Sequence, residues 1–389
     1  MIPRAIQAEF EVCRREAPVV AVTGPRQSGK TTLARTSCPN RPYVSFEDPL
    51  VRERFREDPK GLLHDCRDGA VFDEAQRVPE LFSFLQGMVD ERPEPGRFVV
   101  TGSQNFGLVE QITQSLAGRV ALLELLPFAA AELESGGWLG ADLDTALFAG
   151  GFPPVFDRGL RPGRWYADYV ATYLERDVRQ ITQVHDLGTF TRFLRLCAGS
   201  VGQLFNASRI GADCGVDHKT IRKWVSVLEA SYVGFLVPPY HANVRKRVIK
   251  TPKLYLCDTG LACHLLGIQE PAQLAAHPLR GALFENWVFA EILKHLRNRG
   301  SRQPVYFWRT HGGQEVDFLV EDAGGLIGVE VKSGMSVRPE AGRLLTDVLQ
   351  EWDGRPRRGT IVYGGAETAT LAGCRLLPWR SVGRLWENQ

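Results

Sequence analysis

Residues 24–31 read GPRQSGKT, and this stretch decides the fold of the first part of the chain. The apolar run Val19-Val20-Ala21-Val22 precedes it and Thr32-Leu33-Ala34-Arg35 follows it, which predicts a strand, a loop and a helix in that order. Glycines and a Lys-Thr pair at this spacing, in this context, are the pattern of a phosphate-binding P-loop. The alternative is a glycine-rich turn that matches the pattern by chance.

The P-loop pattern predicts a nucleotide site that uses ATP and Mg²⁺. Backbone N–H groups of the curled loop and the positive end of the following helix attract phosphate oxygens. Lys30 is expected to reach the β- and γ-phosphates, and the Thr31 hydroxyl to bind Mg²⁺. The residues assigned to nucleotide binding are Gly24, Pro25, Arg26, Gln27, Ser28, Gly29, Lys30, Thr31, Thr32 and, from a later strand, Ser103.

Length and composition narrow the classes of protein that remain. The 389 residues predict two or three domains, and 44% hydrophobic with 24% charged residues is typical of globular proteins. The formal net charge is only +2, so a nucleic-acid surface has to be a local patch. The N-terminus lacks the apolar core of a signal peptide, and no run reaches the roughly 18 apolar residues of a membrane span. Eight cysteines without a C-x-x-C pair predict reduced thiols in a cytoplasmic protein.

A predicted strand that ends in two acids favours ATP hydrolysis. Residues 69–75 read GAVFDEA, so Asp73 is expected to hold Mg²⁺ and Glu74 to polarise the attacking water. Adjacent acids at a strand end also cap helices, which is the alternative for this pair taken alone. Their place one strand after the P-loop favours the catalytic interpretation.

Polar residues beside two further predicted strands are candidates for contacts with the γ-phosphate. The strand at residues 97–101 leads to Ser103, Gln104 and Asn105. In ATPases with an extra strand between the two Walker elements, a polar residue at this tip senses the γ-phosphate, and the sequence does not choose among the three. Arg119 precedes the next apolar strand, residues 120–126. It is a candidate for neutralising phosphate charge in cis or from a neighbouring subunit, and a structural salt bridge is its alternative.

The segments GPRQSGKTTLAR, VFDEAQ, FVVTGSQNF and SLAGRV together resemble a prokaryotic branch of the AAA+ ATPase superfamily. Its members join the ATPase to a C-terminal domain of unknown function, DUF4143. Alternating strands and helices around a P-loop predict an α/β fold with a parallel sheet covered on both faces. The resemblance includes a Tyr-Leu-Glu-Arg-Asp segment and so implies Arg176 as a second trans-acting arginine, with a helical ion pair as its alternative. The expected domains are the ATPase (1–130), a helical lid or linker (131–200), a winged helix-turn-helix (201–270) and a nuclease-like domain (271–389).

Residues 208–233 predict the two helices of a winged helix-turn-helix. Asp217 is a candidate N-cap for the second helix, whose apolar residues fall on one face. Apolar strands around Phe235 and Tyr240 are expected to form the wing. We expect basic residues to contact DNA phosphates and grooves, with a protein-packing module as the alternative. These residues are Lys219, Arg222 and Lys223 on the helix and Arg245, Lys246 and Arg247 after the wing.

The C-terminal region predicts a pair of facing carboxylates. Residues 314–321 and 326–332 are expected to form a hairpin with a turn at 322–325, in which Asp317 faces Glu330 at a Cβ separation of roughly 4.5–5.5 Å. Like charges so placed repel each other unless a cation lies between them. Lys332 shares the face of Glu330, because side chains alternate along a strand. Mg²⁺ or Mn²⁺ held by Asp317 and Glu330 beside Lys332 would make a hydrolytic centre.

With Glu285 on a predicted helix, these residues resemble the PD-(D/E)xK nuclease superfamily. Glu285, Asp317, Glu330 and Lys332 match its helix acid, its strand acid and its E-x-K positions, whereas Val316 stands where the family usually has proline. The resemblance implies metal-dependent DNA cleavage. An inactive descendant that only holds nucleic acid is the alternative.

The patterns together predict an ATP-hydrolysing, DNA-binding protein with a C-terminal DNA nuclease centre, acting as a homo-oligomeric ring or stack. The second hypothesis is a DNA-bound regulatory ATPase whose nuclease fold is inactive. A P-loop kinase of a small substrate is the third, and it leaves the helix-turn-helix and the E-x-K region without a role.

Overall fold

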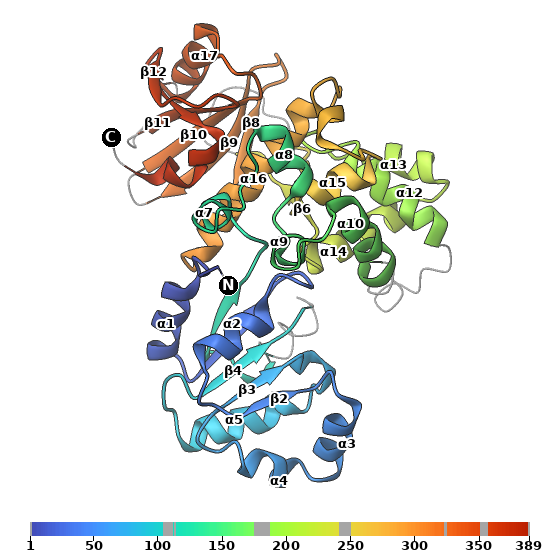
Figure 1. Cartoon of the computed structure of the whole chain (residues 1–389), viewed down its shortest axis with the longest axis vertical. Coiled ribbons are helices and arrows are strands. Elements are labelled where there is room, and N and C mark those ends of the chain that lie inside the picture. The colour runs from blue at the N-terminus through green and yellow to red at the C-terminus, as the bar shows by residue number, and fades with distance from the viewer. Residues whose placement is uncertain are drawn as a thin grey trace. The chain divides into compact units, whose positions relative to one another are not determined.

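The P-loop joins a strand to a helix in the computed structural model, which describes residues 2–103, 112, 114–174, 187–240, 250–322, 325–350 and 357–387. The chain divides into two compact units. The first contains Met1–Pro127 and two short later segments, Ala230–Tyr232 and Leu296–Ser301, and the second contains the rest. Figure 1 shows the elements of both units, coloured along the chain.

The first unit is built on a parallel sheet whose strand order is β2-β3-β4-β1-β5. The strands are β1 (Val19–Thr23), β2 (Tyr43–Ser45), β3 (Ala70–Asp73), β4 (Phe98–Thr101) and β5 (Val120–Glu124). The helices are α1 (Gln7–Glu16), α2 (Lys30–Ser37), α3 (Pro49–Glu57), α4 (Pro59–His64), the short η1 (Ala75–Arg77) and α5 (Leu81–Glu91). This arrangement confirms the predicted α/β fold.

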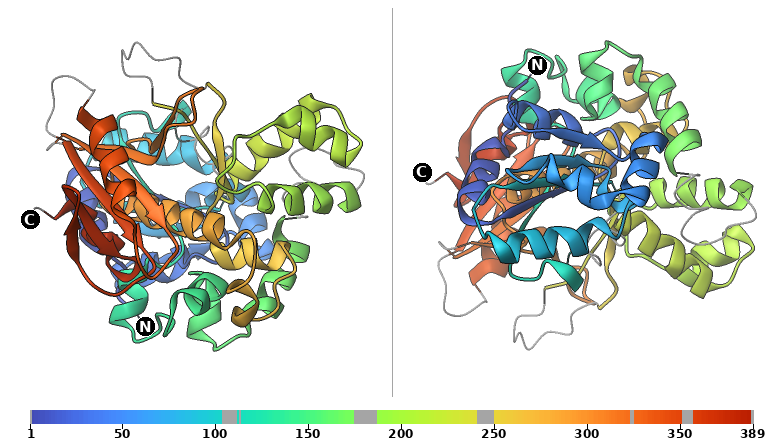
Figure 2. Two further views of the ribbon diagram at one scale, coloured as in Figure 1. Left: turned by 90° about the horizontal axis from the view of Figure 1, so that it is seen from above. Right: turned by 90° about the horizontal axis from the view of Figure 1, so that it is seen from below.

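Helices cover both faces of this sheet because successive strand residues point to opposite sides. Val20 and Val22 of β1 pack into a core with α1 and α2. Val19 and Ala21 pack into a second core, to which α3, α4 and α5 contribute. Helices of the first unit lie on both sides of its sheet in Figure 2.

The strand order determines which loops meet. β4 lies between β1 and β3, so the predicted extra strand between the two Walker elements is confirmed. The strands are parallel, and the P-loop, the Asp73-Glu74 pair and Ser103 therefore follow the carboxyl ends of adjacent strands at one edge of the sheet. This is the edge where ligands bind in open α/β sheets.

Helices make up most of the second unit before its C-terminal sheet. The helices are α7 (Ala130–Ser135), α8 (Leu143–Ala149), α9 (Pro153–Asp157), α10 (Pro162–Tyr169), the π-helix η2 (Val170–Leu174), α12 (Leu187–Ala198), α13 (Ala207–Cys214), α14 (His218–Ala230), α15 (Thr259–Leu265), the short η3 (Pro271–Leu274) and α16 (Arg280–Asn298). The strands β6 (Gly234–Val237) and β7 (Lys253–Leu256) lie between α14 and α15. α13 and α14 are the two helices predicted for the helix-turn-helix. Gly215, with φ 75°, ends α13 in the left-handed conformation. Asp217 caps α14, since its Oδ1 accepts the Thr220 N–H at 2.7 Å.

The strand expected around Tyr240 does not pair with the strand around Phe235, so that detail of the wing is wrong. β6 (Gly234–Val237) pairs in antiparallel fashion with β7 (Lys253–Leu256). The segment at Pro239 and Tyr240 instead contacts the C-terminal sheet, where the Tyr240 N–H donates to the Phe307 carbonyl at 2.7 Å. The predicted basic residues Arg245, Lys246 and Arg247 lie outside the described residues.

The C-terminal part of the second unit is a mixed sheet with the order β12-β13-β11-β10-β9-β8. Its elements are β8 (Tyr306–Arg309), β9 (Glu315–Asp322), β10 (Gly325–Lys332), α17 (Pro339–Gln350), β11 (Arg357–Tyr363), β12 (Ala369–Leu371), β13 (Cys374–Pro378) and η4 (Trp379–Trp386). β9 and β10 pair with Leu326 opposite Glu321, which confirms the predicted register. Pairing also extends to Asp322 opposite Gly325, so the hairpin is tighter than the four-residue turn predicted.

The cysteines and the hydropathy of the helices complete the description of the fold. All eight cysteines are free and buried. Among the described residues, no helix combines the length and the apolar character needed to cross a membrane.

Candidate functional site

The P-loop is held in a backbone conformation that requires glycine. Gly24 has φ 145°, and a Cβ there would lie 2.1 Å from the Leu125 carbonyl oxygen. Gly29, at the N-terminus of α2, has φ 98°. A side chain at either position would be strained. The two glycines thus permit the curled backbone that places an anion site at the start of α2.

Lys30 is buried, and its ammonium group folds back onto the loop. Its Nζ donates to the carbonyl oxygens of Gly24 at 3.0 Å and Pro25 at 2.8 Å. A cation in this position favours phosphate oxygens beside the loop. The predicted role of Lys30 thus has a matching geometry.

The Asp73 carboxylate accepts hydrogen bonds from hydroxyl groups on three other elements, α2, β2 and β4. Thr31 Oγ1 donates to its carboxylate at 3.0 and 3.1 Å, Tyr43 donates at 2.7 Å, and Thr101 also donates. Thr31 and Asp73 supply the hard oxygen ligands that Mg²⁺ prefers, so these residues fit the predicted ion. Burial, and then the neighbouring Asp73, raises the pKa of Tyr43, which keeps this hydroxyl protonated as a donor.

Glu74 is fixed by its neighbours beside Asp73. Gln76 Nε2 donates to its Oε2 at 2.7 Å, and Ser103 Oγ donates to the same oxygen at 3.4 Å. Ser103 therefore contacts Glu74, whereas Gln104 and Asn105 lie outside the described residues. Sequence reasoning missed Gln76, Tyr43 and Thr101, although Gln76 stands within the quoted VFDEAQ segment.

Two residues outside the motif, Arg4 and Tyr232, contact the P-loop and the strand that precedes it. Arg4 donates to the Ser28 carbonyl at 2.8 Å and to the Leu126 carbonyl at 2.7 Å. The Tyr232 hydroxyl donates at 2.7 Å to Thr23, the last residue of β1. Tyr232 has φ 58°, a conformation rare for a residue with a side chain. No local sequence pattern marks either residue.

Of the two candidate trans-acting arginines, the structure describes only Arg119. Arg119 lies before β5, next to Val19 at the start of β1, which is the sheet edge opposite the P-loop. Its guanidinium pairs with Asp90 at 2.6 Å. Arg119 therefore does not reach the nucleotide site of its own chain, which leaves the salt bridge or an action in trans. Arg176 lies outside the described residues.

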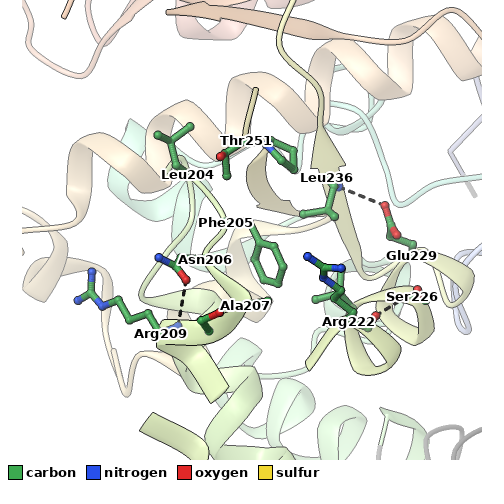
Figure 3. Close-up of a pocket in the computed structure, with 13 residues that line it drawn as sticks. Leu204, Phe205, Asn206, Ala207, Arg209, Arg222, Ser226, Glu229, Leu236 and Thr251 are labelled. Atoms are coloured by element: carbon green, nitrogen blue, oxygen red, sulfur yellow. Dashed lines mark hydrogen bonds between the residues drawn. The ribbon is translucent and has the colours of Figure 1, made fainter. Parts of the chain in front are cut away.

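One of the basic residues of α14, Arg222, lines a cavity of about 810 Å³. Lys219, Arg222 and Lys223 are exposed, as predicted. Figure 3 shows Arg222 and Glu229 on one side of the cavity, both from α14, and Asn206 on the other. Leu236 N–H donates to the Glu229 carboxylate at 3.4 Å. The cavity is lined by residues of α13, α14, β6 and the segments at 204–206 and 251–252.

Asp317, Glu330 and Lys332 meet in the C-terminal sheet. The β9–β10 ladder ends at the pair Phe318 and Val329, directly before Asp317 and Glu330, and the Val331 N–H donates to Asp317 Oδ2 at 2.8 Å. Lys332 Nζ contacts Glu330 Oε1 at 2.6 Å, so the lysine shares the face of that carboxylate. Glu330 Oε2 is buried and has no hydrogen-bond partner in the described structure.

Glu285, the predicted helix acid, is held by residues that the sequence analysis did not single out. Lys253 of β7 contacts Glu285 Oε1 at 2.9 Å and Glu315 Oε1 at 2.5 Å. The Tyr255 hydroxyl donates to the same Glu285 oxygen at 2.5 Å. Lys253 carries no motif, and only the pairing of β6 with β7 brings it to these acids.

Burial and neighbouring charges shift the pKa values of Asp317, Glu330 and Lys253. Burial raises the pKa of Asp317 well above its ordinary value, and the charges of Glu285 and Glu330 raise it further. Burial also raises the pKa of Glu330, while Lys332 opposes that shift. Burial alone would lower the pKa of Lys253, but the neighbouring carboxylates, led by Glu285, outweigh it and hold the ammonium charged.

The acids of this centre fit a divalent ion only in part. Asp317 Oδ2 accepts the Val331 N–H at 2.8 Å, and Glu330 Oε2 is an orphaned oxygen beside it. These two carboxylates suit Mg²⁺ or Mn²⁺. No group of three or more His, Cys, Asp or Glu side chains in the described ranges is arranged to hold a metal ion.

Comparison with known proteins divides the chain among three family models. An AAA domain matches residues 16–134, a domain of unknown function (DUF8612) matches residues 140–272, and a domain of unknown function (DUF4143) matches residues 280–382. The Walker-type ATPase of Pyrococcus abyssi is similar in structure, with 16% identity, 67% of this chain and 94% of that chain covered, and a TM-score of 0.47. A likeness at this level says nothing about activity.

Two curated relatives match nearly the whole chain. They are protein Rv2008c of Mycobacterium tuberculosis and protein Mb2031c of Mycobacterium bovis, both described as uncharacterized. Each is 35% identical over 373 residues, which cover 95% of this chain and 81% of the relative. The chain therefore belongs to the same family as these two mycobacterial proteins, and it is an AAA-type ATPase with a C-terminal DUF4143 domain.

Proposed function

We propose that this ATPase binds DNA in a nucleotide-dependent manner and cleaves it at a metal-dependent centre in the DUF4143 region. The buried Glu330 Oε2, which has no hydrogen-bond partner in the described structure, is the observation that carries the cleavage proposal. An anionic oxygen without a donor is costly in a protein interior, and a cation beside it removes the cost.

In the nucleotide site, each residue has a role that follows from its contacts. Lys30 and the P-loop N–H groups bind and orient the triphosphate. Glu74 takes a proton from the attacking water, and Gln76 and Ser103 fix the orientation of its carboxylate. Thr31 and Asp73 would hold Mg²⁺, which neutralises phosphate charge when bound.

DNA binding is proposed for the exposed face of α14. Lys219, Arg222 and Lys223 supply three cations in its first two turns, and phosphate contacts of this kind dominate non-specific affinity. Arg222 also borders the cavity shown in Figure 3. A recessed surface next to a basic helix suits a sugar–phosphate backbone.

In the acidic centre, Asp317 and Glu330 would hold the divalent ion, which supplies an acidified water and a polarised phosphodiester when bound. Lys332, paired with Glu330 at 2.6 Å, would stabilise negative charge on the scissile phosphate. The substrate would be a nucleic-acid backbone, as in the nucleases that this E-x-K arrangement resembles.

We also propose a homo-oligomer, ring-like or stacked. Arg119 would be its trans-acting arginine, because its position leaves a nucleotide of a neighbouring subunit as the only one it could reach, beside its ion pair with Asp90. ATP binding would close neighbouring subunits around DNA, and hydrolysis would reset them.

A second candidate function is a DNA-bound regulatory ATPase whose nuclease fold is inactive. The ion pairs of Lys253 with Glu285 and Glu315 favour it, since an internal ammonium already neutralises part of the acidic cluster.

Purified full-length protein, incubated with linear, branched and single-stranded DNA, with and without ATP and with Mg²⁺ or Mn²⁺, separates these functions. We expect metal-dependent scission that is lost in Asp317→Asn while ATP hydrolysis continues, and the converse in Glu74→Gln. Nucleotide-dependent DNA binding without scission would establish the regulatory function instead. Scission by Asp317→Asn at the wild-type rate would rule out the proposed centre.

A further inference from the structure

Lys253 is a buried cation in the middle of the acidic centre. Its side chain is only 3% exposed. Lysine is almost never buried to this degree unless it is paired, because an ammonium group loses its hydration. Here the compensation comes from two carboxylates, Glu285 at 2.9 Å and Glu315 at 2.5 Å. Lys253 therefore occupies the space between these two acids.

Glu285 is already satisfied by protein groups. Its Oε1 accepts from both Lys253 and the Tyr255 hydroxyl. Its Oε2 lies close to Gly202, where an added Cβ would come within 3.3 Å. Glu285 thus lies against β7 and the Gly202 turn with one oxygen paired, whereas Glu330 has a buried Oε2 without a donor.

The cluster therefore separates into two halves. One half contains Glu285 and Glu315 with Lys253 between them. The other contains Asp317 and Glu330, with Lys332 on one Glu330 oxygen only. Both halves bring carboxylates together, but among these four acids, in the described structure, only Glu330 has a buried oxygen without a hydrogen-bond partner.

We infer that the Lys253 ammonium stands in the place of a second divalent cation, so that the centre takes a single Mg²⁺ or Mn²⁺ ion, at Asp317 and Glu330. Glu285 is then a positioning residue that anchors Lys253, and neither a metal ligand nor the catalytic helix acid that the nuclease resemblance implies. The inference rests on the proposed function for the Asp317–Glu330 half. For the Glu285–Glu315 half it rests on the observed ion pairs alone.

The test measures Mn²⁺ stoichiometry by calorimetry and by electron paramagnetic resonance. The protein is full-length and nucleotide-free, and it carries Asp73→Asn so that the ATPase site does not contribute. We expect one bound Mn²⁺ in this background, none after Asp317→Asn, and two after Lys253→Met, because methionine frees Glu285 and Glu315 for a second ion. The double variant Lys253→Met with Glu285→Gln is the matched control. It removes the ammonium together with one of its acids, and it should return to one ion.

Glu285→Gln alone provides a second test that does not depend on the folding of Lys253→Met. It should retain the single Mn²⁺ site, whereas Glu330→Gln should lose it. Loss of the site in Glu285→Gln would make Glu285 a ligand and overturn the inference. Two Mn²⁺ ions in the presence of Lys253 would also overturn it, as would a stoichiometry that Lys253→Met leaves unchanged.

Failure of the proposed function gives a different Mn²⁺ stoichiometry from failure of the inference about Lys253. A protein without any Asp317-dependent Mn²⁺ site would remove the cleavage proposal. The inference about Lys253 would then stand if Lys253→Met gains an ion and fall if it gains none.

Discussion

Glu74 has a left-handed backbone, with φ 55°, which for a residue with a side chain costs about 1 to 3 kcal/mol. The surrounding contacts maintain it: Gln76 and Ser103 hold the carboxylate, and the Glu74 N–H faces Thr101 Oγ1 at 3.4 Å. Strain of this kind clusters at functional sites, where it directs a reacting group. Here it directs the acid toward the end of β4.

Glu74→Gln should lower kcat for ATP hydrolysis by about 100-fold or more while ATP binding persists, because glutamine cannot accept the proton of the attacking water. Steady-state hydrolysis and fluorescent-nucleotide binding measure the two quantities. Glu80→Gln, an exposed acid next to α5, is the matched control and should leave both unchanged. Hydrolysis at the wild-type rate in Glu74→Gln would show that another group is the base.

Asp317→Asn should stabilise the metal-free protein, and increasingly so as the pH rises. The folded-state pKa of Asp317 is raised by burial and by Glu285 and Glu330, so the wild type loses stability as the pH rises from the ordinary aspartate value through the folded one. Asparagine does not ionise but keeps an oxygen for the Val331 N–H. Urea unfolding at a series of pH values tests this. A stability difference that shrinks with rising pH would contradict it.

The residues that a motif carries could be predicted from the sequence, and those that only the fold brings to a site could not. Asp73 was predicted because it ends an apolar strand after a P-loop. Tyr43 and Thr101 reach Asp73 only because β2 and β4 flank β3. Lys253 reaches Glu285 across more than thirty residues of chain, and no periodicity encodes that contact.

At the scale of elements, the segment before α1 serves as a brace for the P-loop. Arg4 spans two carbonyl groups, those of Ser28 in the loop and Leu126 after β5. It thereby ties the loop to an edge strand of the sheet. The brace fixes the loop before any phosphate binds.

Arg4→Ala should weaken ATP binding more than it lowers kcat, because the loss falls on the positioning of the P-loop. Each of the two hydrogen bonds from Arg4, a charged donor, contributes about 1.5 to 3 kcal/mol, and the two together set the upper limit of the loss. The matched control is Arg15→Ala, an exposed arginine at the end of α1. A large fall in kcat with unchanged ATP affinity would give Arg4 a different role.

The basic face of α14 should account for a measurable part of the salt dependence of DNA binding. Lys219→Ala with Arg222→Ala should reduce the slope of log K against log salt by about 2, close to one unit per lost phosphate contact. Arg338→Ala with Arg343→Ala removes the same charge from exposed positions in and beside α17 and should leave the slope unchanged. Equal effects of the two pairs would mean that net charge alone attracts DNA.

The sequence predicted a strand's partner where a short turn joins the two strands. It did not predict the partner where the second strand lies far along the chain. The β9–β10 register followed from the length of a local hairpin. The partner of β6 did not, because β7 begins sixteen residues after β6 ends, beyond the segment chosen for the wing. Local geometry constrains the first case, and only tertiary packing determines the second.

At the scale of the whole molecule, late segments of the chain complete the ATPase unit. Arg297, from the end of α16, pairs with Glu124 at 2.6 Å and donates to the Ser301 carbonyl at 2.8 Å. Tyr232 bonds to Thr23 in the same unit. The ATPase fold thus depends on residues far beyond the AAA domain match.

Arg297→Met should lower the free energy of unfolding by about 1 to 3 kcal/mol, because it leaves the half-buried Glu124 without its cation. Arg299→Met, an exposed neighbour, is the control and should change it by less than about 0.5 kcal/mol. Denaturant unfolding followed by loss of ATP hydrolysis provides the measurement. Equal stability of the two variants would show that the Glu124 pair contributes nothing.

The short segments Ala230–Tyr232 and Leu296–Ser301 have a consequence for how such genes evolve. A recombination event that moved only the first 127 codons to a new host gene would leave behind Tyr232 and Arg297, and with them part of the support for β1 and β5. Lineages should therefore inherit this ATPase and its downstream half as one indivisible block, and surveys of gene fusions should find breakpoints outside it.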